Sequence, residues 1–278
     1  MPEPASLNPN TASAKPVSVD HAQGIPTPSQ IEYLTTAYTL QLPSLPFTLT
    51  LHQDQNSAGF IAGKVWPSGP LLASHLSTVF SRTPPPCSLR IVELGAGTGV
   101  GGLAVSQVLS QHGAPADGGF HSVVLTDLPE ALPLLSRNIT ANPTPPTVHT
   151  TAAALPWGST PPATSLLYPD YLIAADVIYW PQLFTPLVDT LRELAGPQTT
   201  VVIAYRKRVP AVEEAFFELF GVHFAFEAVP RGEWGGGEGD WEDAQYYVFR
   251  AARRAIPRSG VSDSFAILEM MEMGEVYE

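Results

Sequence analysis

Apolar residues recur along this chain with two periods, and the order of those periods predicts the fold class. Several short apolar segments are typical of buried strands, at residues 89–94, 122–127, 147–155, 171–178 and 199–206. Other segments carry an apolar stripe at helical spacing, at residues 99–113, 128–142, 181–196 and 210–221. Such alternation favours a mostly parallel sheet with helices on both of its faces.

The segments on either side of this alternation complete the expected sheet. Residues 47–54 alternate apolar and polar side chains like a strand, and residues 70–82 carry a further helical stripe. Residues 223–230 and 244–251 are two strand-like segments with no helix between them, so we expect them to pair antiparallel. The pattern therefore predicts an α/β fold: a Rossmann-like, seven-stranded, mostly parallel sheet that ends in a C-terminal antiparallel hairpin.

Composition divides the chain into three regions. Residues 1–45 are rich in Pro, Ser and Thr without a sustained period, so we expect a disordered leader. Residues 46–252 contain the alternating elements and should form one domain. Residues 253–278 are acidic and carry a cluster of methionines, and we expect them to form a separate tail.

Charge and cysteine content restrict the partners and the compartment. A formal net charge of −12 repels nucleic acid and attracts a basic protein surface. No apolar run approaches the roughly 18 residues of a membrane span, so we expect no membrane contact. The single cysteine, Cys87, cannot form an internal disulfide, which favours a reducing, cytoplasmic setting. The histidines are scattered, and no pair has the spacing of metal ligands, so we expect no metal.

A glycine-rich stretch, "IVELGAGTGVGG", joins the strand at 89–94 to the following helix and matches G-x-G-x-x-G from Gly97. Such a turn binds nucleotide-like ligands at the carboxyl ends of strands. A phosphate-binding P-loop would need Lys and Ser or Thr after its last glycine, and this stretch has neither. Glu93 precedes Gly95 by two residues, where a carboxylate opposes a pyrophosphate and suits a sulfonium and an ammonium group. The loop alone therefore favours S-adenosylmethionine over NAD without excluding NAD.

Asp127 ends the next strand, in "VVLTD". A carboxylate at this place can accept both hydroxyl groups of an adenosine ribose. The alternative is that Asp127 only caps the helix that begins at Leu128. Because NAD and S-adenosylmethionine both contain this ribose, Asp127 predicts an adenosine ligand and does not identify it.

Four segments, two of which contain the glycine loop and Asp127, resemble one protein family. The segments "VELGAGTG", "LTDLPEALPLLSRNI", "LPWG" and "LIAADVIYWPQLFTPLVDTL" are similar to family 16 of the seven-stranded protein-lysine methyltransferases, and the resemblance covers residues 47 to about 250. Within the family, "GKVW", "AYRKR" and "AFFELF" are most similar to the fungal lysine methyltransferases of translation elongation factor 1A. The lysine methyltransferase of valosin-containing protein is the second choice, through its similarity to "FELFGVHFAFE".

The resemblance implies a role for each matching position. It places the cofactor against Trp66, Gly95, Ala96, Gly97, Thr98, Gly99, Asp127, Trp157 and Ala175, and the charge of Glu93 adds that residue to the predicted site. A tryptophan offers the apolar face that an adenine ring needs, which supports Trp157 independently, although Trp157 and Trp66 also suit simple packing positions.

Asp176 and Tyr179 fall on the D-x-x-Y motif of the family, at the expected mouth of the site. Methyl transfer requires a neutral amine in line with the sulfonium, whereas a lysine carries a proton at neutral pH. The resemblance therefore implies that Asp176 orients the substrate lysine or accepts its proton, and that Tyr179 narrows the channel. The alternative is that Asp176 caps the helix near Pro181 and that Tyr179 only packs.

The segment "AYRKR" ends the strand at 199–206 at the same sheet edge. Tyr205 is a candidate for lining the lysine channel. For Lys207 and Arg208 we favour a solvated loop over contact with an acidic patch of a partner.

These observations predict a function for the domain at residues 46–252. We expect a protein-lysine N-methyltransferase that uses S-adenosyl-L-methionine and acts on elongation factor 1A, as a cytoplasmic monomer that binds neither nucleic acid nor membrane. Methylation of another protein, such as an AAA ATPase or a chaperone, is the first alternative. An NAD-dependent oxidoreductase is the second.

Overall fold

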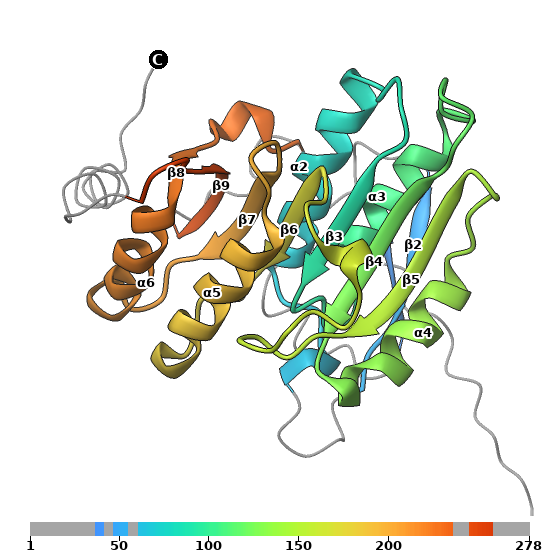
Figure 1. The fold of residues 1–278 in the computed structure, drawn as a ribbon. Coiled ribbons are helices and arrows are strands. Elements are labelled where there is room, and N and C mark those ends of the chain that lie inside the picture. The colour runs from blue at the N-terminus through green and yellow to red at the C-terminus, as the bar shows by residue number, and fades with distance from the viewer. Residues whose placement is uncertain (1–36, 42–46, 55–60, 236–244, 258–278) are drawn as a thin grey trace, which may run out of the picture.

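A seven-stranded sheet forms the centre of the molecule (Figure 1). The computed structural model describes residues 37–41, 47–54, 61–235 and 245–257. The strands lie in the order β5 (Val148–Ala154), β4 (His121–Asp127), β3 (Arg90–Leu94), β6 (Tyr171–Ala175), β7 (Thr200–Arg206), β9 (Tyr246–Arg253) and β8 (Phe224–Ala228). The first five are parallel, and β9 runs antiparallel to both of its neighbours. The predicted fold class, including the C-terminal hairpin, is confirmed.

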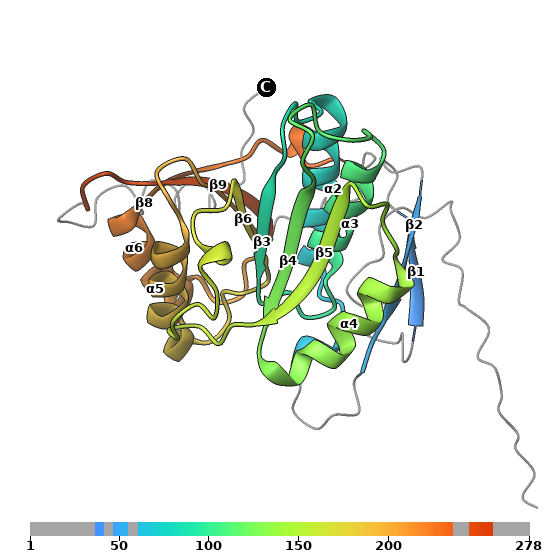
Figure 2. The same ribbon diagram turned by 45° about the vertical axis from the view of Figure 1, so that its right-hand side comes forward.

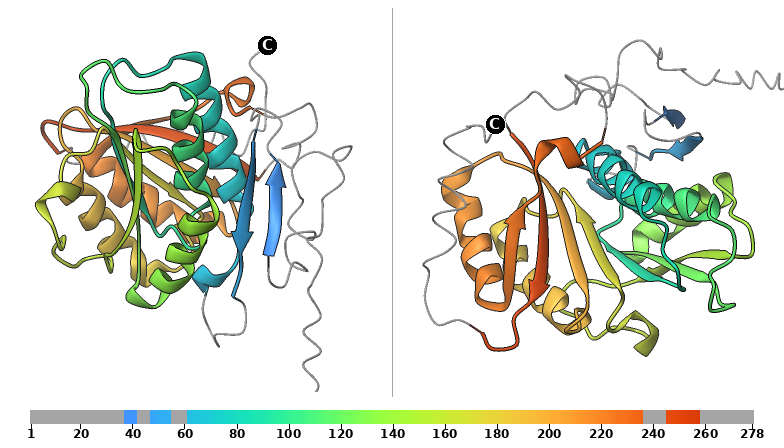
Figure 3. Two further views of the ribbon diagram at one scale, coloured as in Figure 1. Left: turned by 90° about the vertical axis from the view of Figure 1, so that its right-hand side faces the viewer. Right: turned by 90° about the horizontal axis from the view of Figure 1, so that it is seen from above.

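Helices cover both faces of this sheet (Figure 3). The α-helices are α2 (Ser68–Arg82), α3 (Val100–Ser110), α4 (Leu132–Ala141), α5 (Phe184–Leu194) and α6 (Pro210–His223). Short 3₁₀ helices are η1 (Ile61–Gly63), η2 (Pro129–Ala131), η3 (Thr164–Leu166), η4 (Pro181–Leu183) and η5 (Arg231–Glu233). One apolar core joins α2, α3 and α4 to the sheet, and a second joins α5 and α6 to the opposite face. Burial of these two apolar cores away from water is the main force that holds the layers together.

A small separate sheet lies outside α3 and α4 (Figure 2). It pairs β2 (Thr48–His52), which the sequence predicted, with β1 (Ala37–Gln41), which lies inside the segment expected to be disordered. That expectation is therefore wrong for β1. The side-chain amides of Asn138 on α4 and of Asn142 at the C-cap of α4 each bond both backbone groups of a β2 residue, His52 and Thr50 respectively. The two asparagines thus take the place of a neighbouring strand.

The connections of the sheet define where a ligand can bind. From β3 the chain moves outward through β4 to β5, whereas β6 lies on the other side of β3 and leads to β7. This change of direction leaves a crevice beyond the carboxyl ends of β3 and β6, the usual ligand site of an open α/β sheet. Strand β6 ends at Ala175, three residues before the predicted end, because Asp176 turns the chain with a left-handed φ of 54°.

Candidate active site

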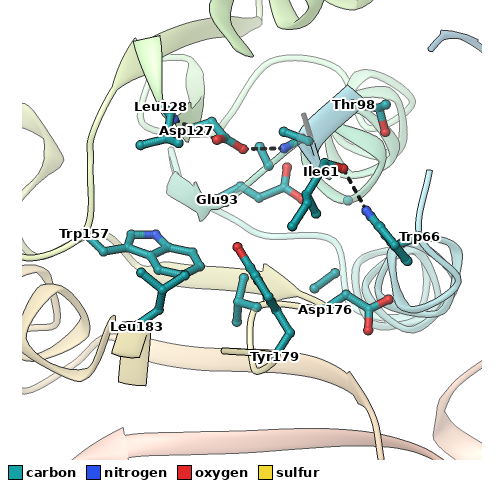
Figure 4. Close-up of a pocket in the computed structure, with 18 of the residues that line it drawn as sticks. Ile61, Trp66, Glu93, Thr98, Asp127, Leu128, Trp157, Asp176, Tyr179 and Leu183 are labelled. Atoms are coloured by element: carbon teal, nitrogen blue, oxygen red, sulfur yellow. Dashed lines mark hydrogen bonds between the residues drawn. The ribbon is translucent and has the colours of Figure 1, made fainter. Parts of the chain in front are cut away.

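A cavity of about 320 Å³ lies beyond the carboxyl ends of the parallel strands (Figure 4). The segments that follow β3, β4, β5 and β6 line it, together with residues 61–69. Every residue that the sequence assigned to the site lines this cavity except Gly99, which is the N-cap of α3, and the candidate Tyr205. The structure therefore brings together side chains from Trp66 to Tyr179 that are up to 113 residues apart in the sequence.

The glycine loop follows β3 and needs its glycines for two different reasons. Gly95 and Gly97 both have left-handed backbones, with φ of 59° and 56°, which other residues adopt only at a cost. A Cβ atom on Gly95 would lie 2.8 Å from the ring of Trp157, and one on Gly97 would lie 3.1 Å from the carbonyl oxygen of Ala62. The glycine loop thus lies between Trp157 and Ala62, and side chains at Gly95 or Gly97 would collide with these residues.

Asp127 fastens the glycine loop to the end of β4. Its Oδ2 accepts a hydrogen bond from the Gly97 amide at 2.7 Å, and its Oδ1 accepts one from the Leu128 amide at 2.7 Å. Burial raises the pKa of Asp127, and these two amides partly offset that effect. A carboxylate has further lone pairs, so Asp127 can hold the loop, cap the following turn and still accept hydroxyl groups from a ligand.

Glu93 lies beneath the first turn of α3. The side chain is only 2% exposed, and its Oε2 accepts a hydrogen bond from the Gly102 amide at 2.9 Å. Burial raises the pKa of Glu93 to about 8, and the nearby Asp127 contributes in the same direction. The carboxyl group is therefore largely protonated at neutral pH. An ammonium group beside it would favour its ionised form, and the preference for a cationic ligand stays a prediction.

One wall of the cavity comes from the segment before α2. The indole nitrogen of Trp66 donates a hydrogen bond to the Ile61 carbonyl at 2.9 Å, which fixes the ring against η1. The Lys64 ammonium lies 4.5 Å above the centre of the Trp66 ring. Lys64 supplies the basic side chain among the described residues that line the cavity. Lys64 was not among the predicted site residues, although its position two residues before Trp66 could have indicated that it lines the cavity.

Aromatic rings form the opposite wall. The centres of the Trp157 and Tyr179 rings lie 6.5 Å apart, and the Trp180 ring meets Tyr179 edge-on at 5.2 Å. Figure 4 shows the Tyr179 hydroxyl pointing into the cavity, towards the side that holds Glu93 and Asp127. Burial raises the pKa of Tyr179, so its hydroxyl stays neutral and can donate a hydrogen bond. Trp180 is 47% exposed and lies at the rim.

Asp176 contacts neither the helix near Pro181 nor open solvent. Its Oδ2 accepts a hydrogen bond from the Ser68 amide at 3.0 Å, and its Oδ1 accepts one from the Arg208 guanidinium at 2.7 Å. Figure 4 shows this carboxylate directed away from the Tyr179 hydroxyl. Asp176 therefore caps α2 rather than the helix near Pro181, and its charge is already balanced by Arg208.

The basic segment after β7 differs from the expectation in two ways. Tyr205 is 1% exposed, and its hydroxyl donates to the buried Glu213, so it belongs to the core and does not line the channel. Burial and this hydrogen bond raise the pKa of Tyr205. Arg208 pairs with Asp176 and is not simply a residue of a solvated loop. No local signal predicts a pair between residues 32 positions apart.

Within residues 37–41, 47–54, 61–235 and 245–257, none of the helices combines the length and the apolar composition of a membrane span. In the same part of the chain, His, Cys, Asp and Glu side chains form no group of three or more that could hold a metal ion.

Comparison with known proteins gives consistent matches. The sequence profile of the lysine methyltransferase family matches residues 46–222. The mouse protein "EEF1A lysine methyltransferase 3" is 30% identical over 213 residues, which cover 76% of this chain and 81% of the relative. Its Xenopus tropicalis counterpart is 35% identical over 51% of this chain and 58% of its own length. The mouse "Protein N-lysine methyltransferase METTL21A" is 33% identical over 58% of this chain and 67% of its own length.

Proposed function

The chain belongs to the lysine methyltransferase family, and we propose that it methylates a lysine of a translation elongation factor of the 1A type. Its reaction is methyl transfer to a protein lysine, and its methyl donor is S-adenosyl-L-methionine. The family match leaves the NAD-dependent alternative without support. We further propose that the protein acts as a cytoplasmic monomer.

The residues of the cavity fit this cofactor. Asp127 offers a carboxylate to the ribose hydroxyls, and the Trp157 ring offers a flat apolar face to adenine. The methionine part of the cofactor carries one ammonium and one carboxylate at neutral pH. Glu93 suits the ammonium and Lys64 suits the carboxylate, because both side chains line the cavity and their ionised forms carry the opposite charges. The presence of Asp127, the Trp157 ring and the buried Glu93 in one cavity is the observation that supports this cofactor.

The chain's own residues explain how the acceptor is prepared for transfer. The cofactor supplies an activated methyl group on a sulfonium. Tyr179 narrows the cavity beside the Trp157 ring, which restricts the direction from which an amine can approach. Apolar side chains around the same opening, including Val177 and Leu183, exclude water from the reacting atoms.

The substrate assignment rests on similarity and on charge. A mouse relative that matches over 213 residues is named "EEF1A lysine methyltransferase 3". A net charge of −12 favours a basic partner surface, which a lysine-bearing segment of such a factor would provide. Another protein substrate, an AAA ATPase or a chaperone, is the competing possibility.

Two measurements test the proposal. Isothermal titration should show that S-adenosylhomocysteine binds and that NADH does not. Incubation of the purified protein with tritiated cofactor and recombinant elongation factor 1A should label the factor, and mass spectrometry should locate the methyl group on a lysine. Labelling of a different protein in an extract, with no labelling of the factor, would overturn the substrate assignment and leave the chemistry intact.

A further inference from the structure

The carboxylate of Asp176 has no free charge to offer an incoming lysine. The side chain of Asp176 is 3% exposed, whereas that of Arg208 is 30% exposed. Both oxygens of the carboxylate are used, one by the Ser68 amide and one by the Arg208 guanidinium. A group in this state does not attract an ammonium in the way that an unpaired carboxylate would.

Arg208 is held in this place from several directions. Its guanidinium donates a second hydrogen bond to the Arg206 carbonyl at 3.2 Å. Its backbone amide donates to both oxygens of Glu213, at 3.1 and 3.2 Å. The Tyr205 hydroxyl also donates to Glu213, which is itself buried on α6. The loop between β7 and α6 is thus built to direct Arg208 at Asp176.

We propose that Arg208 is a positioning residue that balances the charge of Asp176, so that the acceptor lysine enters the site as a neutral amine. This inference rests on the proposed function. Only a neutral amine has the lone pair that methyl transfer needs, and an unpaired carboxylate at this rim would stabilise the ammonium form instead. The Arg208 guanidinium neutralises the Asp176 carboxylate. Its positive charge also disfavours the ammonium form of the lysine.

The chemical step balances without any further reagent. The amine nitrogen donates its lone pair to the methyl carbon, and the electrons of the broken sulfur–carbon bond return to sulfur. The product is a methylammonium, which releases one proton to water. The lysine loses its first proton to water before it enters, so Asp176 is not required as a base.

Other charged groups face this pair and must be separated from it. Glu213 on α6 and Tyr205 on β7 lie behind Arg208, and the Ser68 amide of α2 lies behind Asp176. Across the cavity are Glu93, Asp127, Tyr179 and Lys64. Burial raises the pKa of Glu93 to about 8, within the pH range of the experiment, so its ionisation must be held constant between variants. The test therefore compares variants with each other at saturating cofactor.

The first experiment measures kcat and KM for recombinant elongation factor 1A from pH 6.5 to 9.5. In Arg208→Gln we expect the acidic limb of the kcat profile to move up by about one pH unit, the size expected of one partly screened charge a few ångströms away. At pH 7 the same variant should show a lower kcat and a lower KM, because the protonated lysine now binds. Arg208→Lys keeps the charge and should keep the limb near its original position.

A matched control removes the neighbouring charge. The Lys207 ammonium nitrogen lies 5.9 Å from the centre of the Tyr247 ring. Lys207→Gln should leave the acidic limb where it is. If Arg208→Gln lowers kcat equally at every pH, or if Lys207→Gln moves the limb as far, Arg208 has no such role.

A second experiment needs no protein substrate. Binding of n-butylammonium, which mimics the end of a lysine side chain, is measured by NMR in the presence of S-adenosylhomocysteine. Arg208→Gln should bind this cation at least about 5-fold more tightly than the original protein, and Asp176→Asn in the same background should abolish the gain. Equal binding by all three proteins would overturn the inference. If elongation factor 1A is not methylated and n-butylammonium behaves as expected, only the substrate assignment fails.

Discussion

The two halves of the cavity are built by different rules. In the half that follows β3 and β4, acidic side chains bond backbone amides: Asp127 holds Gly97, and Glu93 holds Gly102. In the half that follows β6 and β7, side chains pair with one another over long sequence separations, as Asp176 does with Arg208. The first half depends on the path of the backbone, and the second depends on how separate elements pack.

This difference gives the acidic side chains of the first half hydrogen-bond partners within the protein itself. Backbone amides at a helix start carry partial positive charge, so the carboxylates of Glu93 and Asp127 have partners whether or not a ligand is bound. In the second half one oxygen of Asp176 has such a partner, the Ser68 amide at the start of α2, whereas the other oxygen depends on Arg208. If Arg208 or Asp176 is lost, the other becomes an unpaired charge at the rim, so changes there should affect protonation and stability together.

The largest expected effect concerns Glu93. Its protonated form is favoured in the folded protein up to about pH 8, whereas in the unfolded chain it ionises near 4.5. The unfolded state therefore binds fewer protons between these values, and the free energy of unfolding should fall as the pH rises from 4.5 to about 8, by up to about 4 kcal/mol. Asp127 acts in the same direction. Urea denaturation at several pH values measures this slope.

Glu93→Gln is the control for that slope, because a glutamine resembles the protonated acid. The variant should match the original protein near pH 4.5 and exceed it in stability at pH 8.5. Parallel curves would show that Glu93 ionises freely, and the first half would then lack its conditional charge.

Asp127→Ala tests whether this carboxylate binds the cofactor as well as the Gly97 amide of the glycine loop. Loss of a charged acceptor for two ribose hydroxyls and the Gly97 amide should weaken binding of S-adenosylhomocysteine by about 1.5–3 kcal/mol, or roughly 10- to 100-fold. Isothermal titration measures the change. Glu130→Ala removes an exposed carboxylate three residues away and should leave the affinity within about 2-fold. Unchanged affinity in Asp127→Ala would defeat the ribose assignment.

The sequence predicted the first half well because its signals are local. Apolar periodicity located the parallel strands, and the glycines mark a turn whose backbone other residues resist. Asp127 falls at a strand end, which places it at the site without further knowledge. The strand and helix ends were off by a few residues, as at β6, where Asp176 turns the chain early.

The second half was predicted less well because its contacts are not local. Nothing in "AYRKR" indicates that Tyr205 turns into the core while Arg208 reaches Asp176 on another strand. The raised pKa of Glu93 had no signal either, since it arises from burial under α3. β1 was missed because its segment is rich in Pro, Ser and Thr, and only pairing with β2 makes it a strand.

Asp176→Ala should lower the free energy of unfolding by about 2 kcal/mol. The change removes the acceptor of the Ser68 amide and of Arg208, although Arg208 is exposed enough to reach water. It also places alanine at a φ of 54°, which costs about 1 kcal/mol more than asparagine does. Asp176→Asn should therefore lose only about half as much in urea denaturation. Equal losses would mean that the left-handed backbone contributes nothing.

Lys64→Met tests the proposed contact between the cavity wall before α2 and the cofactor's carboxylate. A partly exposed ion pair is worth about 1 kcal/mol, so the affinity for S-adenosylhomocysteine should fall roughly 5-fold. Binding of 5′-methylthioadenosine, which lacks the amino-acid part, should stay the same in the same titration. Lys64→Arg should restore most of the loss. An equal drop for both ligands would assign Lys64 to support of Trp66 instead.

Trp180→Ala has the smallest expected effect and tests where the two halves meet. The ring lines the cavity, contacts Tyr179 edge-on and is 47% exposed, so a protein substrate would cover it. Half-exposed aromatic contacts are worth about 0.5–1 kcal/mol, so KM for elongation factor 1A should rise about 2- to 5-fold. Affinity for S-adenosylhomocysteine should change less than about 2-fold, and Trp180→Phe should behave like the original protein. If the cofactor affinity falls instead and KM is unchanged, Trp180 belongs to the cofactor wall. The acceptor half would then begin beyond it, at Asp176 and Arg208.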